Sequence, residues 1–199
     1  MSKVLSRTVV HEGKWVRFVE LACQNGDNTY TWEAIERTTH SKSDLSGTEI
    51  LALIQYPESK QCTQIILIKQ FRPATNLVVI EWPAGLIDNN EDPKSTAVRE
   101  LQEETGYVGE VVHTSCIFAS GPSLSSSLGS IQVMRVNGDD QSSCVNQELE
   151  EAENIEVLII PLDDLYTQLE HLAKTEGLLI ESRLLSFAFG LDFKNRFNL

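Results

Sequence analysis

The chain has 199 residues, a formal net charge of -13, 41% hydrophobic residues and 23% charged residues. These fractions are typical of a folded globular protein and exclude an intrinsically disordered chain. The acidic balance argues against nucleic-acid binding, which relies on Lys and Arg, and no apolar run approaches the roughly 20 residues of a membrane span.

The N-terminal segment and the cysteines bear on the cellular compartment. The segment lacks the apolar core of a signal peptide, so we expect a cytoplasmic protein, with a nuclear location left open. The four cysteines are Cys23, Cys62, Cys116 and Cys144. No two of them form a C-x-x-C pair, which favours free thiols over a zinc site or a disulfide framework.

The first part of the chain predicts an antiparallel hairpin. Residues 15–23 and 30–39 have strand-like patterns, and the turn signal QNGDN lies between them. Further strand patterns follow at residues 49–56, 63–72, 77–85, 109–120, 130–138 and 154–162.

Two helical patterns close the chain, and the first of them, residues 163–177, begins with acidic residues and ends at a glycine. Residues 120–130 and 137–154 have loop-like composition. Strands interleaved with a few helices predict an α/β or α+β sandwich with helices on the faces of a mixed sheet.

A third helix is predicted between the strands. Asp92 has the character of an N-cap, Pro93 suits the first helical position, and Gly106 suits a left-handed cap. The helix is therefore expected to run from about Pro93 to Thr105.

The faces of this helix differ in character. One arc, expected to be buried, carries Ala97, Val98, Leu101 and Thr105, and the adjacent arc carries Glu100, Glu103 and Glu104. Three like charges at helical spacing are destabilising unless they are compensated. Mg²⁺, which prefers carboxylate and carbonyl oxygens, would compensate them. The alternative is a solvated acidic face that Arg99 neutralises.

Residues 85–107 fit the pattern G-x5-E-x7-R-E-U-x-E-E-x-G-U, where U is apolar or aromatic. This resembles the signature of the Nudix hydrolases at every constrained position. The resemblance implies a Nudix-type α/β/α sandwich with a mixed sheet and an additional N-terminal antiparallel region. It also implies hydrolysis of nucleoside diphosphates linked to another moiety, with divalent cations held by the helix.

The resemblance extends beyond the signature to the ADP-ribose pyrophosphatases within that family. The segments GKWV, WEAIERTT, KQFRP and WPAGLID carry it, together with Pro122, sixteen residues beyond the last glycine of the signature. It implies Mg²⁺-dependent hydrolysis of ADP-ribose, and of related ADP-sugars, to AMP and a sugar phosphate such as ribose 5-phosphate. Mn²⁺ is the alternative ion.

The resemblance also implies roles for individual residues. Glu100 and Glu104 correspond to the main metal ligands, with Glu103 and the backbone carbonyl of Ala84 as further ligands. Arg99 joins Glu103 and Glu104 in the catalytic set, and Glu91 and Arg99 support the loop and the helix. Glu153 corresponds to a proposed general base. Other glutamates crowd the same stretch and leave this assignment open: Glu148, Glu150, Glu151 and Glu156.

The implied substrate-binding residues lie on both sides of the signature. Trp15 and Trp32 correspond to aromatic residues that sandwich the adenine, and the other positions are Glu33, Arg37, Arg72, Glu81, Leu86 and Pro122. The alternatives are core tryptophans and ordinary surface arginines. Ser123 and Ser126 depart from the family pattern in a loop that contacts the far half of the substrate, so the preference for a terminal ribose stays open.

The resemblance divides the chain into residues 1–46, exchanged between the subunits of a homodimer, and residues 47–199, the Nudix domain. Three other interpretations remain. The chain is a Nudix hydrolase for another nucleotide sugar, an oxidised nucleotide or a dinucleotide; a non-catalytic nucleotide-sugar sensor on the same fold; or an acidic interaction protein with an accidental match.

Overall fold

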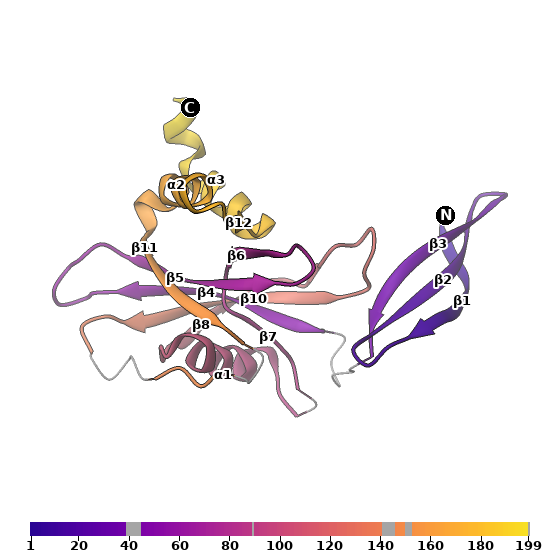
Figure 1. Cartoon of the computed structure of the whole chain (residues 1–199), viewed down its shortest axis with the longest axis horizontal. Coiled ribbons are helices and arrows are strands. Elements are labelled where there is room, and N and C mark those ends of the chain that lie inside the picture. The colour runs from indigo at the N-terminus through magenta and orange to yellow at the C-terminus, as the bar shows by residue number, and fades with distance from the viewer. Residues whose placement is uncertain (39–44, 89, 141–145, 150–152, 199) are drawn as a thin grey trace.

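The computed structural model describes residues 1–38, 45–88, 90–140, 146–149 and 153–198. Within these residues the strands form two sheets, a small one of order β1-β2-β3 and a large mixed one. The small sheet projects sideways from the rest of the molecule (Figure 1), and we call it the arm, residues Lys3–Arg37.

The arm consists of β1 (Lys3–Glu12), β2 (Val16–Asn25) and β3 (Asn28–Arg37), all antiparallel. The turn between β2 and β3 has Gly26 at φ 60°, a left-handed conformation that glycine adopts without strain. The predicted hairpin is confirmed, whereas β1 was not predicted. Every residue of β1 is exposed, so it has no buried face to produce a recognisable period.

The large sheet has a path of paired strands with branches. In spatial order the path is β12 (Leu179–Ile180), β6 (Leu77–Glu81), β5 (Gln64–Arg72), β4 (Gly47–Gln55), β10 (Leu128–Asn137) and β8 (Glu110–Thr114). Off this path, β11 (Ile155–Pro161) pairs with β5, β7 (Ala84–Leu86) with β4, and β9 (Phe118–Ala119) with β10. The β10–β4 and β12–β6 pairs are parallel, which confirms a mixed sheet.

Helices cover both faces of this sheet. α1 (Pro93–Thr105) lies on one face, and α2 (Leu165–Glu176) and α3 (Ser182–Phe197) lie on the other, with the short η2 (Leu162–Asp164) leading into α2 (Figure 1). Along β4, Ile50 packs with Leu101 of α1, and Leu51 packs with Leu184 of α3. Because strand side chains alternate, Glu49 shares the α3 side with Leu51. The predicted sandwich is confirmed.

The helix α1 has the predicted bounds and caps. The Asp92 carboxylate accepts a hydrogen bond from the Ser95 N–H at 2.8 Å, and Gly106, at φ 74°, donates to the Gln102 carbonyl. One detail of the predicted burial was wrong. Val98 is 39% exposed and Thr96 is buried in its place, because the Thr96 hydroxyl donates to Glu91 of the preceding loop.

Two predicted strands are divided in the structure. Residues 77–85 form β6 and β7, separated at Trp82 and Pro83, where proline lacks the N–H that a sheet ladder requires. Residues 109–120 form β8 and β9. The predicted loop at residues 137–154 falls partly outside the described residues.

The cysteines and the helices complete the description. Cys23, Cys62 and Cys116 are free thiols, and Cys144 lies outside the described residues. Among the helices in the described part of the chain, none has both the length and the apolar character needed to cross a membrane.

Candidate active site

The strand β7 packs against α1 through a close approach of backbone and carboxylates. The Ala84 N–H donates to Oε2 of Glu104 at 3.0 Å. An ideal Cβ on Gly85 would lie 2.0 Å from the carboxylate carbon of Glu100, so the Glu100 side chain fills the space that any larger residue would need. The glycine that opens the signature therefore makes room for one of its glutamates.

These two carboxylates are poorly solvated. Glu104 is only 4% exposed, and burial raises its pKa to about 8, against the lowering effect of the Ala84 N–H, with Glu100 and Glu153 adding to the increase. Burial likewise raises the pKa of Glu100 to about 7, although Arg99 opposes it. Oxygen ligands held close together with insufficient positive charge nearby fit a hard divalent cation.

Arg99 is the centre of an ion-pair network on the same helix. Its Nε and Nη2 each donate to Glu91 at 2.9 Å, and its Nη1 donates to Glu100 and Glu103 at 2.8 Å each. The hydrogen bonds from Arg99 lower the pKa of Glu91 to about 2, with further help from Thr96. Arg99 thus ties the loop before α1 to two of the signature glutamates.

This network sets a condition on metal binding. In the part of the chain that the structure describes, no three acidic, His or Cys side chains converge closely enough to hold an ion as they stand. Glu100 and Glu103 share the same Nη1 of Arg99. Binding of an ion by the described carboxylates would therefore require side-chain rearrangement.

Residues that precede Glu153 in the chain contact the C-terminal end of α1. The Gln147 side-chain amide donates to the Glu104 carbonyl, and the Glu148 N–H donates to the Glu103 carbonyl at 2.9 Å. These bonds satisfy carbonyls that a helix end leaves free. The charge of Glu153 raises the pKa values of Glu100 and Glu104, so the predicted general base is within electrostatic range of the predicted metal ligands. Glu150 and Glu151 lie outside the described residues.

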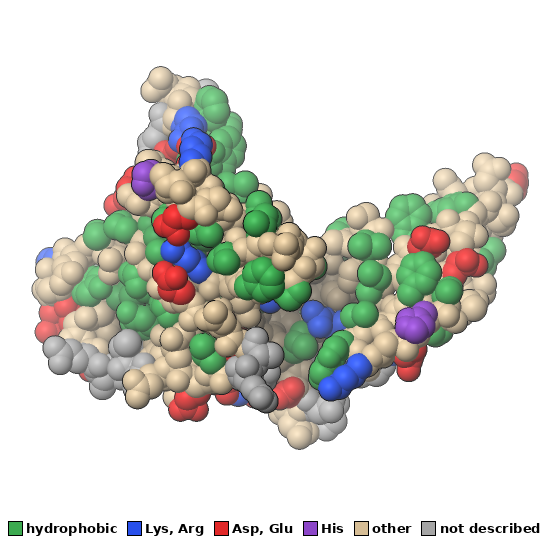
Figure 2. All heavy atoms as spheres, viewed as in Figure 1, with side chains coloured by type: hydrophobic (Ala, Val, Ile, Leu, Met, Phe, Trp, Pro, Cys, Tyr) green, Lys and Arg blue, Asp and Glu red, His purple; other side chains and the backbone are tan. Residues whose placement is uncertain are grey.

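A cavity of about 370 Å³ adjoins these carboxylates at the ends of β4 and β7. Ala84, Gly85 and Leu86 form one wall, and Arg37 and Arg72 also line it. The space-filling view shows a hollow where the arm meets the body, with Lys or Arg side chains inside it (Figure 2). The structure therefore brings predicted ligand-binding arginines next to the acidic helix.

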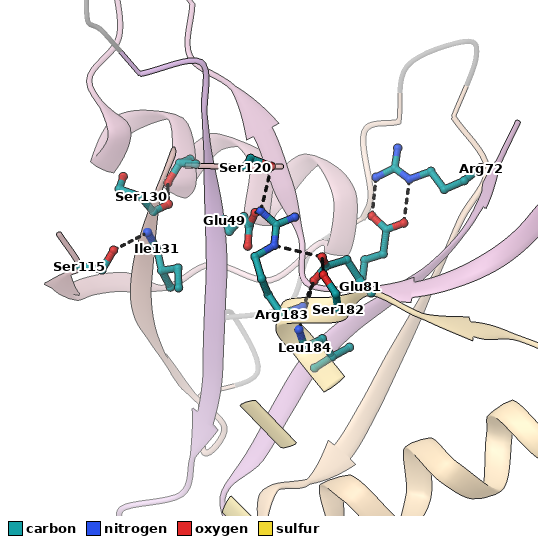
Figure 3. A network of polar contacts seen from close by, with 12 residues as sticks. Glu49, Arg72, Glu81, Ser115, Ser120, Ser130, Ile131, Ser182, Arg183 and Leu184 are labelled. Carbon is teal, nitrogen blue, oxygen red and sulfur yellow. Dashed lines mark hydrogen bonds and ion pairs between the residues drawn. The ribbon is translucent and has the colours of Figure 1, made fainter. Parts of the chain in front are cut away.

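Arg72 is held by a bidentate ion pair. Its Nε donates to Oε1 of Glu81 at 2.8 Å and its Nη2 donates to Oε2 at 2.6 Å (Figure 3). The Arg72 side chain is 44% exposed and that of Glu81 only 13%. The carboxylate thus lies behind the guanidinium, which presents its charge to the cavity.

The sequence did not single out a second cluster that lines the same cavity. Glu49 forms an ion pair with Arg183, whose Nη1 donates to the Ser120 hydroxyl at 3.3 Å and whose Nε lies 3.0 Å from Glu181 (Figure 3). Burial raises the pKa of Glu49 to about 7, against the lowering effect of Arg183. The one feature of the sequence that could have indicated this cluster is Glu49, an acidic residue near the start of the largely apolar strand β4.

The predicted adenine-binding tryptophans lie on the arm and are not core residues. Trp15 is 61% exposed and Trp32 is 46% exposed, and the indole N–H of Trp32 donates to the Ser123 carbonyl at 3.2 Å. Within the described residues, the cavity lining does not include Trp15, Trp32, Glu33 or Pro122.

The register of the arm separates the two tryptophans. The Trp15 carbonyl accepts a hydrogen bond from Thr38, whereas Trp32 opposes Leu21. The rings are thus attached six residues apart along the ladder, about 20 Å at the rise of a β-strand. One base between two stacked rings is far thinner than this distance. Trp15 and Trp32 of a single chain therefore do not enclose one base.

The chain is similar to known proteins over most of its length. The family model of the NUDIX domain matches residues 49–180. The ADP-sugar pyrophosphatase of Mus musculus is 33% identical over 194 residues, 96% of this chain and 87% of that protein. The ADP-ribose pyrophosphatase of Saccharomyces cerevisiae is 33% identical over 172 residues, 84% of this chain and 72% of that protein.

A similar fold is found among solved structures. The crystal structure of an ADP compounds hydrolase superposes with a TM-score of 0.67 and 19% sequence identity, covering 94% of this chain and 90% of that one. At this identity the similarity concerns the fold, and it includes the segments that form the arm as well as the sandwich.

Proposed function

The chain belongs to the Nudix hydrolase family, and from this premise we propose that it hydrolyses the pyrophosphate bond of ADP-ribose to give AMP and ribose 5-phosphate. The observation that carries the proposal is the buried pair Glu100 and Glu104 beside β7, at the edge of a cavity that Arg72 lines. The similarity to pyrophosphatases of ADP-sugars and ADP-ribose supports the choice of substrate.

The residues of the cavity have complementary tasks in this reaction. Arg72, fixed by Glu81, donates hydrogen bonds to phosphate oxygens, for which a bidentate-held guanidinium is well suited. Arg37 lines the same cavity and adds a second positive charge for the phosphate groups. Glu153, near Glu100 and Glu104, accepts a proton from the attacking water.

The carboxylates supply a cation site. Glu104 and Glu100, with Glu103 and the Ala84 carbonyl, would hold Mg²⁺ or Mn²⁺, since their oxygens are of the kind these ions prefer. When bound, the ion draws charge from the phosphate oxygens and increases the acidity of water. The chain itself positions the carboxylates, through the Gly85 contact and through Arg99.

The separation of the tryptophans supports a homodimer. If Trp15 and Trp32 stack on the two faces of one adenine, the two rings come from different chains, because one chain attaches them at backbone positions about 20 Å apart. The arm has exposed apolar side chains that a second copy would cover, among them Val4, Val10 and Tyr30. Residues 1–46 would then be the part that is exchanged, with residues 47–199 forming the catalytic domain.

The proposal is tested by incubating the purified protein with ADP-ribose and Mg²⁺ in heavy-oxygen water. We expect AMP and ribose 5-phosphate, with the label in one of the two products identifying the phosphorus attacked. A parallel panel contains other nucleotide sugars, oxidised nucleotides and dinucleotides. Cleavage of a panel member without any AMP from ADP-ribose would refute the substrate and leave the family assignment intact.

A further inference from the structure

Two guanidinium–carboxylate pairs lie at the cavity, and they differ in which of their groups line it. At Arg72 only the guanidinium lines the cavity, because Glu81 lies behind it. At the other end both Arg183 and its partner Glu49 line the cavity. The part of the cavity at Arg72 therefore presents a cation alone, whereas the part at Arg183 presents a cation together with the anion of Glu49. These two surfaces suit different parts of a substrate.

The cluster around Arg183 has no net positive charge to offer to an anion. Arg183 contacts two carboxylates, Glu49 and Glu181, so the cluster carries an excess negative charge when both are ionised. It is neutral when Glu49 is protonated. In neither state is there the net positive charge that a phosphate or carboxylate group of a ligand requires. Carboxylate oxygens do, however, accept hydrogen bonds from hydroxyl groups.

Neighbouring residues make this end suitable for a sugar. The Ser120 hydroxyl accepts a hydrogen bond from Arg183 and adds a further polar group to the wall (Figure 3). The ring of Phe118 lines the same part of the cavity, with Cζ of Arg183 5.5 Å from its centroid. Hydroxyl-binding groups beside an aromatic surface suit the two kinds of surface that a sugar ring presents.

Glu49 also lies on the strand that pairs with β7, beside the proposed reaction site. In the β4–β7 pair, Glu49 lies opposite Ala84, and opposed residues of antiparallel strands have their Cα atoms about 5 Å apart. The N–H of Ala84 contacts Glu104. A group attached to a phosphate that is bound near Ala84 thus lies in the same cavity that Glu49 lines.

We propose that Glu49, positioned by Arg183, binds the hydroxyl groups of the terminal sugar and makes the enzyme select an uncharged terminal group over one that carries an additional phosphate. This inference rests on the proposed function, since it concerns the second half of the same substrate. Glu49 is a specificity-determining residue in this scheme, and Arg183 is a positioning residue.

The test compares two substrates, ADP-ribose and ADP-ribose that carries a phosphate on its terminal ribose. The wild-type protein is expected to have a kcat/KM at least about tenfold higher for ADP-ribose. In Glu49→Gln, loss of a charged hydrogen-bond acceptor is expected to reduce this preference about tenfold, mainly by lowering kcat/KM for ADP-ribose. Inhibition by AMP, which has no terminal sugar, should stay at the wild-type level.

Two further variants sharpen the result. Arg183→Lys keeps the charge but loses the planar fork, and it should shift the preference in the same direction. Glu110→Gln disrupts another carboxylate–arginine pair, with Arg135, that does not line this cavity, and it should leave the preference unchanged. Thermal unfolding shows whether each variant is folded, and if Glu49→Gln is not, the ratio in Arg183→Lys decides.

The outcomes separate this inference from the proposed function. A wild-type protein that does not cleave ADP-ribose overturns the proposed function. A wild-type protein that cleaves ADP-ribose without preferring it to the phosphorylated form overturns the inference alone. So does a folded Glu49→Gln variant whose preference equals that of the wild type, or one whose inhibition by AMP weakens as much as its turnover.

Discussion

The carboxylate of Glu100 lies where a side chain on Gly85 would begin, since an ideal Cβ there would be 2.0 Å from the Glu100 carboxylate carbon. Gly85→Ala must therefore displace Glu100. The displaced atoms are the end of a flexible side chain, so we expect the free energy of unfolding to fall by less than about 1 kcal/mol. Activity should fall much more, because a predicted metal ligand moves. Denaturant unfolding and kcat/KM over a range of Mg²⁺ concentrations measure the two effects.

Gly190→Ala is the matched control for this substitution. Gly190 lies within α3, and a Cβ there would meet nothing within 4 Å. Because alanine has the higher helix propensity, this variant should keep its activity and be slightly more stable. If Gly85→Ala retained the wild-type turnover and Mg²⁺ dependence, the contact between Gly85 and Glu100 would have no functional role.

Glu104→Gln should separate activity from folding. Burial disfavours the charged form of Glu104, so a neutral amide of the same shape is expected to fold at least as stably, with the Ala84 N–H donating to the amide oxygen. Turnover should fall at least about a hundredfold, since an oxygen of the proposed metal site is lost. Thermal unfolding and kcat measure the two effects.

Glu103→Gln, at a more exposed position, should have the smaller effect on kcat. Full activity of a folded Glu104→Gln variant would refute the metal-binding role of Glu104.

The signature region could be predicted from the sequence because its residues belong to one strand–loop–helix unit. Within such a unit the spacing along the chain determines the position in space, as the caps of α1 at Asp92 and Gly106 illustrate. Glu49 and Arg183 are distant in sequence and meet only through the order of the strands and the placement of α3. Neither residue has a local pattern that indicates such a contact.

The arm illustrates a second limit of sequence reasoning. β2 and β3 were predicted because the turn signal and the alternating residues are local. β1 pairs with β2 through its backbone, and none of its side chains is buried, so a search for a buried face does not detect it. The tryptophans were recognised only by their resemblance to the family, and their separation depends on a strand register that composition does not determine.

Trp15→Ala and Trp32→Ala test whether each site contains residues from two chains. Loss of one stacking ring should lower kcat/KM about tenfold or more in each variant. When the two variants are co-expressed, a mixed dimer would contain one site with both tryptophans missing and one site with both present. Activity should then recover to about a quarter of the wild-type value, the fraction of intact sites in a statistical mixture. Kinetics of the co-expressed mixture, against an equal mixture of the separately purified variants, measure the recovery.

The same experiment has a clear negative outcome. If both tryptophans of a site belonged to one chain, every site of a mixed dimer would lack one ring, and co-expression would restore nothing. Sedimentation of the wild-type protein at several concentrations provides the independent measurement. A monomer at all concentrations would contradict the proposed dimer.

Glu91 gives the protein an acid-sensitive interaction. Hydrogen bonds from Arg99 lower its folded-state pKa to about 2 from its ordinary value of 4.5. The unfolded state therefore takes up the proton first, so the stabilisation is fully present above pH 4.5 and is lost as the pH falls from 4.5 towards 2. Glu91→Gln should lower the free energy of unfolding by roughly 1 kcal/mol near neutral pH. The difference from the wild type should shrink near pH 3.

Denaturant titrations at the two pH values measure this difference. Glu110→Gln, which removes an exposed carboxylate paired with Arg135 at 3.4 Å, is the control, and its small effect should vary little between them. A Glu91→Gln variant whose deficit was equal at both pH values would show that the ion pair with Arg99 does not contribute to stability through the charge of Glu91.

Glu153→Gln tests the assignment of the general base against its neighbours. Glu153 lies near Glu100 and Glu104, so its replacement should lower kcat by about two to four orders of magnitude with little change in KM. Glu148→Gln is the control: the Glu148 side chain is exposed, and its backbone N–H keeps the bond to Glu103. If Glu148→Gln caused the larger loss of kcat and Glu153→Gln stayed close to the wild type, Glu148 would be the general base instead.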